Sequence, residues 1–245
     1  EVGFDTSFKA FKVLDEGENV WGRGLRHVAE PYARHTLIPE PNRTPDRLYP
    51  FDDTETLDEV HRVRLGIRNK LQTRRGGREV QDLLDADLAT TYRFVKPEGA
   101  SDFGTVDANV RLRPGDTFKL DFDARYDASA SEFAEFNARL AAIAGDRSRW
   151  DLEYRYRPDA RNSVNSEIAL FPKAPWSFGL QHRFDLDDGQ LEEHGYSIQR
   201  RMSCVTWSVG ISHEPARADG EKDDFRVWVR FWLNALPGRA LDLGG

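Results

Sequence analysis

The sequence predicts an all-β protein, an antiparallel up-and-down transmembrane β-barrel of which about 13 strands are present, as a portion of a larger barrel. Three observations support this fold class: strict alternation of apolar and polar residues, runs of about nine to twelve residues, and aromatic side chains near the ends of the runs. Alternation alone is shared with soluble β-sandwiches, whose strands more often have about five or six residues. The length of the runs and the placement of the aromatic residues therefore favour the membrane barrel.

Three segments alternate without a break, at residues 105–113, 117–126 and 149–157. In the second, Phe118 and Leu120 begin a side that is apolar or aromatic throughout, and the residues between them are polar or charged. Successive side chains of an extended strand point to opposite faces of its sheet. Each segment is therefore predicted to be a strand with one apolar face and one charged face.

Weaker alternation predicts ten further strands. They lie at residues 2–13, 23–37, 60–73, 80–94, 132–143, 161–171, 176–185, 193–202, 204–213 and 225–235. The alanines of residues 138–144 also suit a helix, but Phe136, Ala138, Leu140 and Ala142 keep the period of two that is typical of a strand. We therefore expect a strand there as well.

The connections between the predicted strands alternate in length. Short turns are expected at residues 75–78, 113–116, 144–147, 172–175 and 202–204, and longer connections at 38–59, 185–192 and 214–224. Outer-membrane barrels have short periplasmic turns and longer extracellular loops, so the last strand is expected to end in the periplasm and the first to begin outside the cell. Because bacterial single-chain barrels have even strand numbers, we expect residues 1–245 to be the C-terminal portion of a barrel domain that lacks its upstream strands.

The composition argues against several classes of protein. The chain is 39% hydrophobic and 31% charged, and no apolar run approaches the roughly 18 to 20 residues that a membrane helix needs. The net charge of -7 argues against a nucleic-acid partner, because binding to phosphate backbones needs a basic surface. Cys204 is the only cysteine, so neither an internal disulfide nor a cysteine-based zinc site is expected.

Catalytic chemistry has little support in the sequence, and only the fold class leaves an enzymatic barrel open. The six histidines are scattered, and the chain has no nucleophile-elbow, zinc-hydrolase or phosphate-loop motif. Acidic residues at 187–188 and 192–193 suit a solvated loop better than a cation site. We predict no enzyme activity, no cofactor and no metal.

Four stretches carry a resemblance to a known family. Residues 26–35 hold a Glu-Pro step within a strand pattern and lead to a proline before a long connection, and residues 57–71 have an acidic entry, alternation and a central glycine. Residues 196–211 have the pattern of a penultimate hairpin, and residues 225–236 that of a closing strand. In this order they resemble the barrel of the LptD family, the lipopolysaccharide-assembly proteins also called organic solvent tolerance or OstA proteins.

The resemblance implies an outer-membrane translocon that inserts lipopolysaccharide into the outer leaflet. The sugars would pass through the barrel lumen while the lipid tails leave sideways between strands. The implied partners are lipopolysaccharide, outer-membrane lipid, a plug lipoprotein of the LptE type and the periplasmic proteins of the lipopolysaccharide bridge. The resemblance also implies a periplasmic domain that is absent from this chain, and makes residues 225–235 one edge of a lateral gate.

Two single residues carry further expectations. Pro31 lies within a strand pattern, where it removes a backbone donor, so we expect either a strand kink or an ordinary bulge. Cys204 matches a family cysteine that pairs with upstream cysteines to tie the barrel to the periplasmic domain. Because Ser203 stands where the family commonly has a second cysteine, the resemblance implies a single inter-domain disulfide or none, and a buried free thiol is the alternative.

The charged side of the clearest strands is the candidate functional surface. In a barrel it would face the lumen, and its members are Lys119, Asp121, Asp123, Arg125, Asp151, Glu153, Arg155 and Arg157. These residues either form a polar wall for sugar headgroups and a plug, or form salt bridges with one another without a ligand role. A generic outer-membrane porin and a soluble lipid-binding β-sandwich remain alternatives to the translocon.

Overall fold

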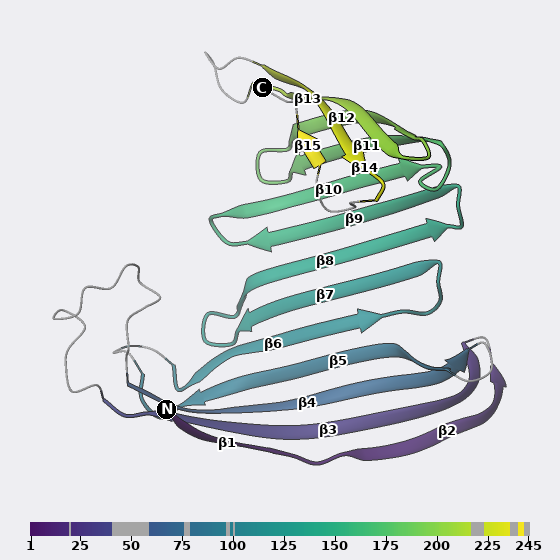
Figure 1. Ribbon diagram of the computed structural model, residues 1–245. Helices are drawn as coiled ribbons and strands as arrows, with labels where there is room; N and C mark the ends of the chain where they lie inside the picture. Colours follow the sequence, from purple (N-terminus) through teal and green to yellow (C-terminus); the bar gives the residue numbers. More distant parts are fainter. Residues whose placement is uncertain are drawn as a thin grey trace. The chain divides into compact units, whose positions relative to one another are not determined.

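The computed structural model is built of antiparallel strands, which confirms the predicted all-β, up-and-down fold class (Figure 1). It describes residues 1–19, 21–40, 59–75, 79–96, 99, 101–216, 223–235 and 240–242. Strands that follow one another in the chain pair side by side from β3 to β15, and β1 and β2 both pair with β3. The described residues contain no helix that is long and apolar enough to cross a membrane.

The strands are long for a soluble sheet. They are β1 (Val2–Ser7), β2 (Ala10–Asn19), β3 (Gly22–Ile38), β4 (Val60–Arg75), β5 (Glu79–Arg93), β6 (Phe103–Leu112), β7 (Phe118–Asp127), β8 (Glu132–Ala144), β9 (Ser148–Arg157), β10 (Arg161–Leu170), β11 (Trp176–Asp185), β12 (Gln190–Arg201), β13 (Val205–Glu214), β14 (Asp224–Leu233) and β15 (Ala240–Asp242). At about 3.3 Å per residue, a ten-residue strand is roughly 33 Å long. Tilted by about 35 to 45°, such a strand rises roughly 25 Å, which is the height of the apolar band of an outer-membrane barrel.

The structure has more strands than the sequence predicted, because residues 2–13 are not one strand and β15 was not expected. The first segment divides into β1 and β2, which pair with different parts of the 17-residue β3. The break at Phe8 lies opposite Pro31, whose carbonyl accepts the Phe8 N–H at 3.1 Å but which has no N–H to complete the pair. The segment 138–144 is part of the strand β8, as its period of two predicted.

The predicted alternation of connection lengths is wrong in the middle of the chain. The connection expected at 185–192 is a short turn of residues 186–189. The Asp185 carboxylate closes this turn by accepting the N–H groups of Asp187 at 2.8 Å and Asp188 at 3.2 Å, and Gly189 supplies the positive φ of 65°. Most of the predicted connections at 38–59, 75–78 and 214–224 lies outside the described residues.

The chain divides by its internal contacts into two compact units. Unit 1 consists of residues 1–112 and 123–134, and unit 2 of residues 113–122 and 135–245. In both units the strands are held by continuous antiparallel ladders, of which β3 with β4 and β9 with β10 are examples.

The described residues bury few apolar side chains. Leu83, Ala89 and Ala141 are the buried hydrophobic residues among them, whereas Leu65 and Trp150 are 47% and 48% exposed. Soluble monomers rarely leave large contiguous apolar patches open to water. The apolar faces of the strands are therefore not covered by the rest of the described chain.

Candidate functional site on the charged face

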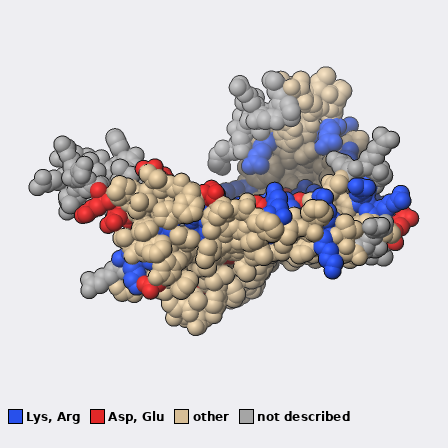
Figure 2. Space-filling model, turned by 90° about the horizontal axis from the view of Figure 1, so that it is seen from below, with Lys and Arg blue, Asp and Glu red and all other residues tan. Residues whose placement is uncertain are grey.

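The register of unit 1 separates a charged face from an apolar face. Arg68 of β4 lies opposite Asp87 of β5, whereas Ile67, the preceding residue, lies opposite Leu88. We call the side that carries Arg68 and Asp87 the charged face of unit 1, and the side that carries Ile67 its apolar face. Figure 2 shows charged side chains of both signs gathered beside one another, next to wide areas that carry none.

Cross-strand ion pairs cover the charged face of unit 1. Lys70 Nζ lies 3.0 Å from Asp82 Oδ2 and 3.2 Å from Asp85 Oδ2, so one ammonium serves two carboxylates. Arg64 Nη1 lies 2.6 Å from Asp107 Oδ2. Partly exposed pairs of this kind contribute little individually, on the order of 0 to 1 kcal/mol, but together they fix side chains in place.

The Tyr32 side chain of β3 contacts both β4 and β5 on this face. Its ring lies over Gly66 of β4, where an added Cβ would be only 2.4 Å from the ring. Its hydroxyl donates to the Asp87 carboxylate of β5, with distances of 3.0 and 3.2 Å to the two oxygens. The Arg68 guanidinium stacks over the ring, 4.5 Å from its centroid. The missing side chain of Gly66 therefore makes the space that this contact needs.

Unit 2 has the same two faces. Glu153 of β9 lies opposite Arg139 of β8, whereas Leu152 lies opposite Leu140. We call the side of Glu153 the charged face of unit 2.

The four predicted residues of β9 all form ion pairs on this charged face. Asp151 binds the Arg149 guanidinium through two hydrogen bonds of 2.6 and 3.0 Å. Glu153 and Arg155 pair with each other at 2.9 Å, and Arg157 lies 3.6 Å from Glu135. These carboxylates and guanidinium groups therefore satisfy one another within the sheet, as the salt-bridge interpretation expects.

The predicted residues of β7 are divided between the two units. In unit 2, Asp121 accepts a hydrogen bond from Arg113, and Lys119 is exposed. In unit 1, Arg125 Nε lies 3.7 Å from Asp107 Oδ1, and Asp123 is exposed.

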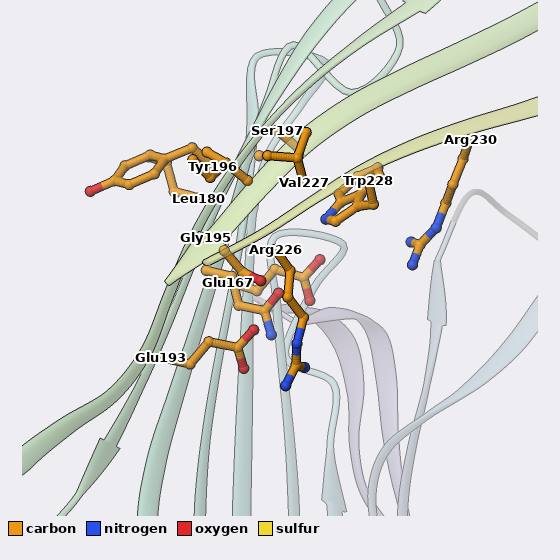
Figure 3. Close-up of a pocket in the computed structure, with 14 residues that line it drawn as sticks. Glu167, Leu180, Glu193, Gly195, Tyr196, Ser197, Arg226, Val227, Trp228 and Arg230 are labelled. Atoms are coloured by element: carbon orange, nitrogen blue, oxygen red, sulfur yellow. The ribbon is translucent and has the colours of Figure 1, made fainter. Parts of the chain in front are cut away.

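A hollow of about 450 Å³ opens on the charged face of unit 2 (Figure 3). Its polar lining comes from β10 to β14 and consists of Glu167, Gln181, Glu193, Ser197, Ser212, Arg226 and Arg230. Small residues in its lining, among them Gly179, Gly195 and Ser197, leave this space. Figure 3 shows Tyr196 and Leu180 pointing to the other side of the strands.

The Trp228 ring at the edge of this hollow contacts a glycine and an arginine. A Cβ at Gly210 would lie 2.3 Å from the ring, so one face rests on the glycine backbone. The Arg230 guanidinium lies over the ring, 4.4 Å from its centroid. The tryptophan therefore packs between β13 and β14.

A row of aromatic and histidine rings lines one end of the apolar face in each unit. In unit 1, Phe4 stacks on His35 at 5.1 Å between ring centroids, His35 meets His61 at 5.2 Å, and His61 stacks on Phe94 at 4.3 Å. In unit 2, His194 meets His213 at 4.8 Å, and His213 stacks on Phe225 at 4.1 Å.

Tryptophans lie at the opposite end of the apolar face of unit 2. Trp176 meets Trp207 at 5.7 Å, and Arg200 stacks over Trp176 at 4.5 Å. Trp207 precedes His213 by six residues along β13, which is roughly 20 Å at about 3.3 Å per residue. An apolar band with rings at both ends is typical of a membrane-facing surface.

Of the two other predicted residues, Pro31 lies on the apolar face of unit 1, opposite Ile67, and Cys204 lies in a turn. The ladder between β3 and β4 continues through Pro31 without a register shift, so any irregularity falls on the side of β1 and β2. Cys204 is exposed and free in the turn before β13, and its carbonyl accepts the Asn234 N–H at 2.9 Å. Whether it pairs with another domain stays a prediction.

The described residues contain no group of three or more His, Cys, Asp or Glu side chains that could hold a metal ion. The chemistry that the charged face offers is binding through paired charges and hydroxyl groups. The sequence did not predict the contact of Tyr32 with Gly66, the contact of Trp228 with Gly210, or the arginine cluster around Arg62 and Arg64. The arginines at alternate positions were the available signal, but pairing between strands was needed to bring the cluster together.

A scan against models of known protein families finds no match, and a search of curated proteins finds no similar sequence. The resemblance to the LptD family therefore stays a prediction.

Proposed function

We propose that this chain forms strands of an outer-membrane β-barrel that delivers lipopolysaccharide to the outer leaflet. The observation that carries the membrane part of this proposal is the two-faced sheet, whose large apolar side chains stay exposed on one face. Examples are Leu65, Leu88 and Ile211, which are 47%, 49% and 42% exposed. Lipid can cover such a face, because strands that cross a bilayer need apolar side chains on their outer face and backbone groups that are hydrogen-bonded within the protein.

Three features support the membrane orientation further. The strands are long enough to cross a bilayer, rings lie at both ends of the apolar band of unit 2, and the opposite face carries ion pairs. A soluble sandwich would pack its apolar faces together, and the described residues bury too few apolar side chains for such a core.

The cargo is inferred from the sequence resemblance. In the proposed mechanism, the charged face carries the sugar portion through water while lipid tails remain in the bilayer. Ion pairs such as those of Asp151 and Glu153 keep the wall polar without leaving isolated charges. The proposed partners are lipopolysaccharide, a plug lipoprotein and periplasmic bridge proteins.

Depletion of the full-length parent protein in its native host tests this function. Surface lipopolysaccharide is expected to fall and to accumulate inside the outer membrane, while an unrelated outer-membrane barrel keeps its amount. The control restores the parent gene from a plasmid and is expected to restore the surface lipid. Unchanged surface lipopolysaccharide after depletion would overturn the proposal.

The ion-paired polar wall also suits a general porin, which is the second candidate function. Single-channel recording separates the two candidates with the same full-length protein. A stable, open and solute-selective pore favours the porin, whereas the translocon is expected to stay closed to small solutes when its plug is bound.

A further inference from the structure

Two pairs of arginines face each other on neighbouring strands of unit 1. Arg34 of β3 lies opposite Arg64 of β4, and Arg62 of β4 lies opposite Arg93 of β5. All four side chains lie on the charged face. Arg62 and Arg64 are an even number of residues from Arg68 on β4, and Arg93 and Arg34 lie opposite them on the neighbouring strands. Like charges placed directly opposite each other destabilise a sheet. A nearby anion is therefore expected to stabilise two such pairs that lie side by side.

Each arginine of the first pair has a carboxylate partner in the sheet. Arg34 Nε lies 2.7 Å from Asp5 Oδ1, and Arg64 Nη1 lies 2.6 Å from Asp107 Oδ2. Asp107 is shared, because Arg125 Nε also lies 3.7 Å from its other oxygen. These two aspartates are therefore already occupied by three guanidinium groups.

The second pair is compensated less fully. Among the residues that the structure describes, Arg62 takes part in no ion pair, and the charge of Arg93 acts on the Asp127 carboxylate without forming an ion pair with it. Arg62 is exposed on the charged face and Arg93 is half-buried. Arg62 therefore keeps an uncompensated positive charge among the described residues, although the chain as a whole has a net charge of -7.

Arg62 lies at a small hollow together with both arginines of the first pair. The hollow has a volume of about 150 Å³ and is lined by Arg34, Thr36, Arg62, Arg64 and Thr91. Thr36 is buried, with 8% of its surface exposed, and both threonines can donate a hydroxyl hydrogen bond. Guanidinium forks around hydroxyl donors are the groups that recognise a tetrahedral oxyanion.

We propose that this hollow binds a phosphate-type oxyanion. The volume suits a small anion or a single phosphate group of a larger molecule, and the guanidinium forks can bind its oxygens in pairs. A bound dianion would also remove the repulsion between the opposed arginines. The inference goes beyond the proposed function, because it needs only that the charged face is in contact with water.

The full-length parent protein in mild detergent is the material for the test, and calorimetric titration is the measurement. The probes are inorganic phosphate, inorganic pyrophosphate, and a phosphorylated glycolipid compared with its dephosphorylated form. Binding of the inorganic anions identifies a site for free phosphate. Binding of the phosphorylated glycolipid alone identifies a lipid headgroup as the source of the phosphate.

Three variants locate the site. Arg62→Gln is expected to weaken binding of whichever phosphate probe binds by roughly ten-fold or more, because a hydrogen bond to a charged group is lost. Arg62→Lys keeps the charge but loses the fork, so an intermediate weakening is expected. The matched control is Arg111→Gln on β6, which removes the same charge from the same face outside the hollow and is expected to leave binding unchanged.

Folding of each variant is checked by the faster gel migration of the unheated barrel. The proposal is overturned if no phosphate probe binds the wild-type protein, or if Arg111→Gln weakens binding as much as Arg62→Gln. In either case the translocon proposal still stands, because its own test is the amount of surface lipopolysaccharide.

Discussion

At the scale of single residues, glycine and aromatic side chains act as matched pairs on the charged face. Gly66 leaves room for the Tyr32 ring, which can then reach Asp87 on the next strand. Gly210 leaves room for Trp228 in the same way in unit 2. The absence of a side chain is therefore the structural contribution of these glycines.

Gly66→Ala is expected to lower the free energy of unfolding by about 1 to 3 kcal/mol. The new Cβ would lie 2.4 Å from the Tyr32 ring, so the ring must move and its hydrogen bonds to Asp87 are lost. Urea unfolding of the refolded full-length protein measures the change. Gly195→Ala is the matched control, because its Cβ would meet its nearest atom at 3.5 Å, an ordinary contact, and should cost less. Equal losses of unfolding free energy in the two variants would contradict the role given to the contact between Tyr32 and Gly66.

The arginines of the hollow are expected to affect stability with opposite signs. Without phosphate, Arg62→Gln should raise the free energy of unfolding by roughly 0.2 to 1 kcal/mol, because it removes a like-charge pair with Arg93. Arg64→Gln should lower it, because the Asp107 carboxylate loses its 2.6 Å partner. Both differences should shrink at high salt, since partly exposed charges are screened. Urea unfolding at two salt concentrations measures them, and a destabilising Arg62→Gln would contradict the prediction.

At the scale of elements, the turn between β12 and β13 is fastened by one side chain from the end of β14. Asn234 donates to the carbonyls of Met202 and Ser203 at 2.6 and 3.1 Å. It also accepts the Thr206 hydroxyl at 2.7 Å, and Thr206 is only 1% exposed. This contact holds the turn that carries Cys204 in place.

Asn234→Ala is therefore expected to lower the free energy of unfolding by about 1 to 3 kcal/mol, because the buried Thr206 hydroxyl loses its acceptor. Thr206→Val added to this variant should recover part of the loss, since both partners are then absent. Unfolding of the single and double variants in urea measures the coupling. Strictly additive effects would show that the two side chains do not depend on each other.

The connection that follows β13 is expected to loosen in acid. Asp223 accepts the Ala216 N–H at 3.0 Å and lies 3.3 Å from His213 Nε2, and these contacts, the Ala216 bond first, hold the pKa of the Asp223 carboxyl below its usual value. A lowered folded pKa contributes stability that is present above the ordinary aspartate pKa of about 3.9 and is lost as the pH falls through the folded value.

Hydrogen exchange of residues 211–216 measures this effect. Protection in the wild-type protein should exceed that in Asp223→Ala near neutral pH, and the difference should disappear in strong acid. His213 and Arg226 also face this end of β13, so the neutral variant His213→Gln is the control for titration of the histidine. A difference that persists in strong acid would assign the protection to another contact.

At the scale of the whole molecule, the membrane proposal predicts alternating environments along one strand. Ile211 lies on the apolar face and is 42% exposed, and Ser212 follows it on the charged face opposite Arg226. A fluorescent label on Ile211→Cys should be quenched by spin-labelled lipid, and a label on Ser212→Cys by a water-soluble quencher. Both variants carry Cys204→Ser, so that the new cysteine is the labelled one. Equal quenching of both labels by the water-soluble quencher would favour a soluble protein.

The sequence by itself determined most of the strands and their two faces, but not the division of residues 2–13 into two strands nor β15. Period-two alternation is local, so residues 117–126 and 149–157 could be assigned to strands with a charged side from the amino acids alone. For the same reason it favoured a strand over a helix in residues 138–144, and the structure has a strand there. The connection at 185–192 was predicted too long because the turn depends on one carboxylate, Asp185, that closes it.

Only the tertiary structure decided which residues of the charged face meet. Alternation places Arg34, Arg62 and Arg64 on a face, but the register between β3, β4 and β5 brings them to one hollow. The same register sets Tyr32 over Gly66, which are 34 positions apart in the chain. A shift of one residue in pairing would move every side chain to the opposite face, so these contacts depend on long-range pairing that no local pattern contains.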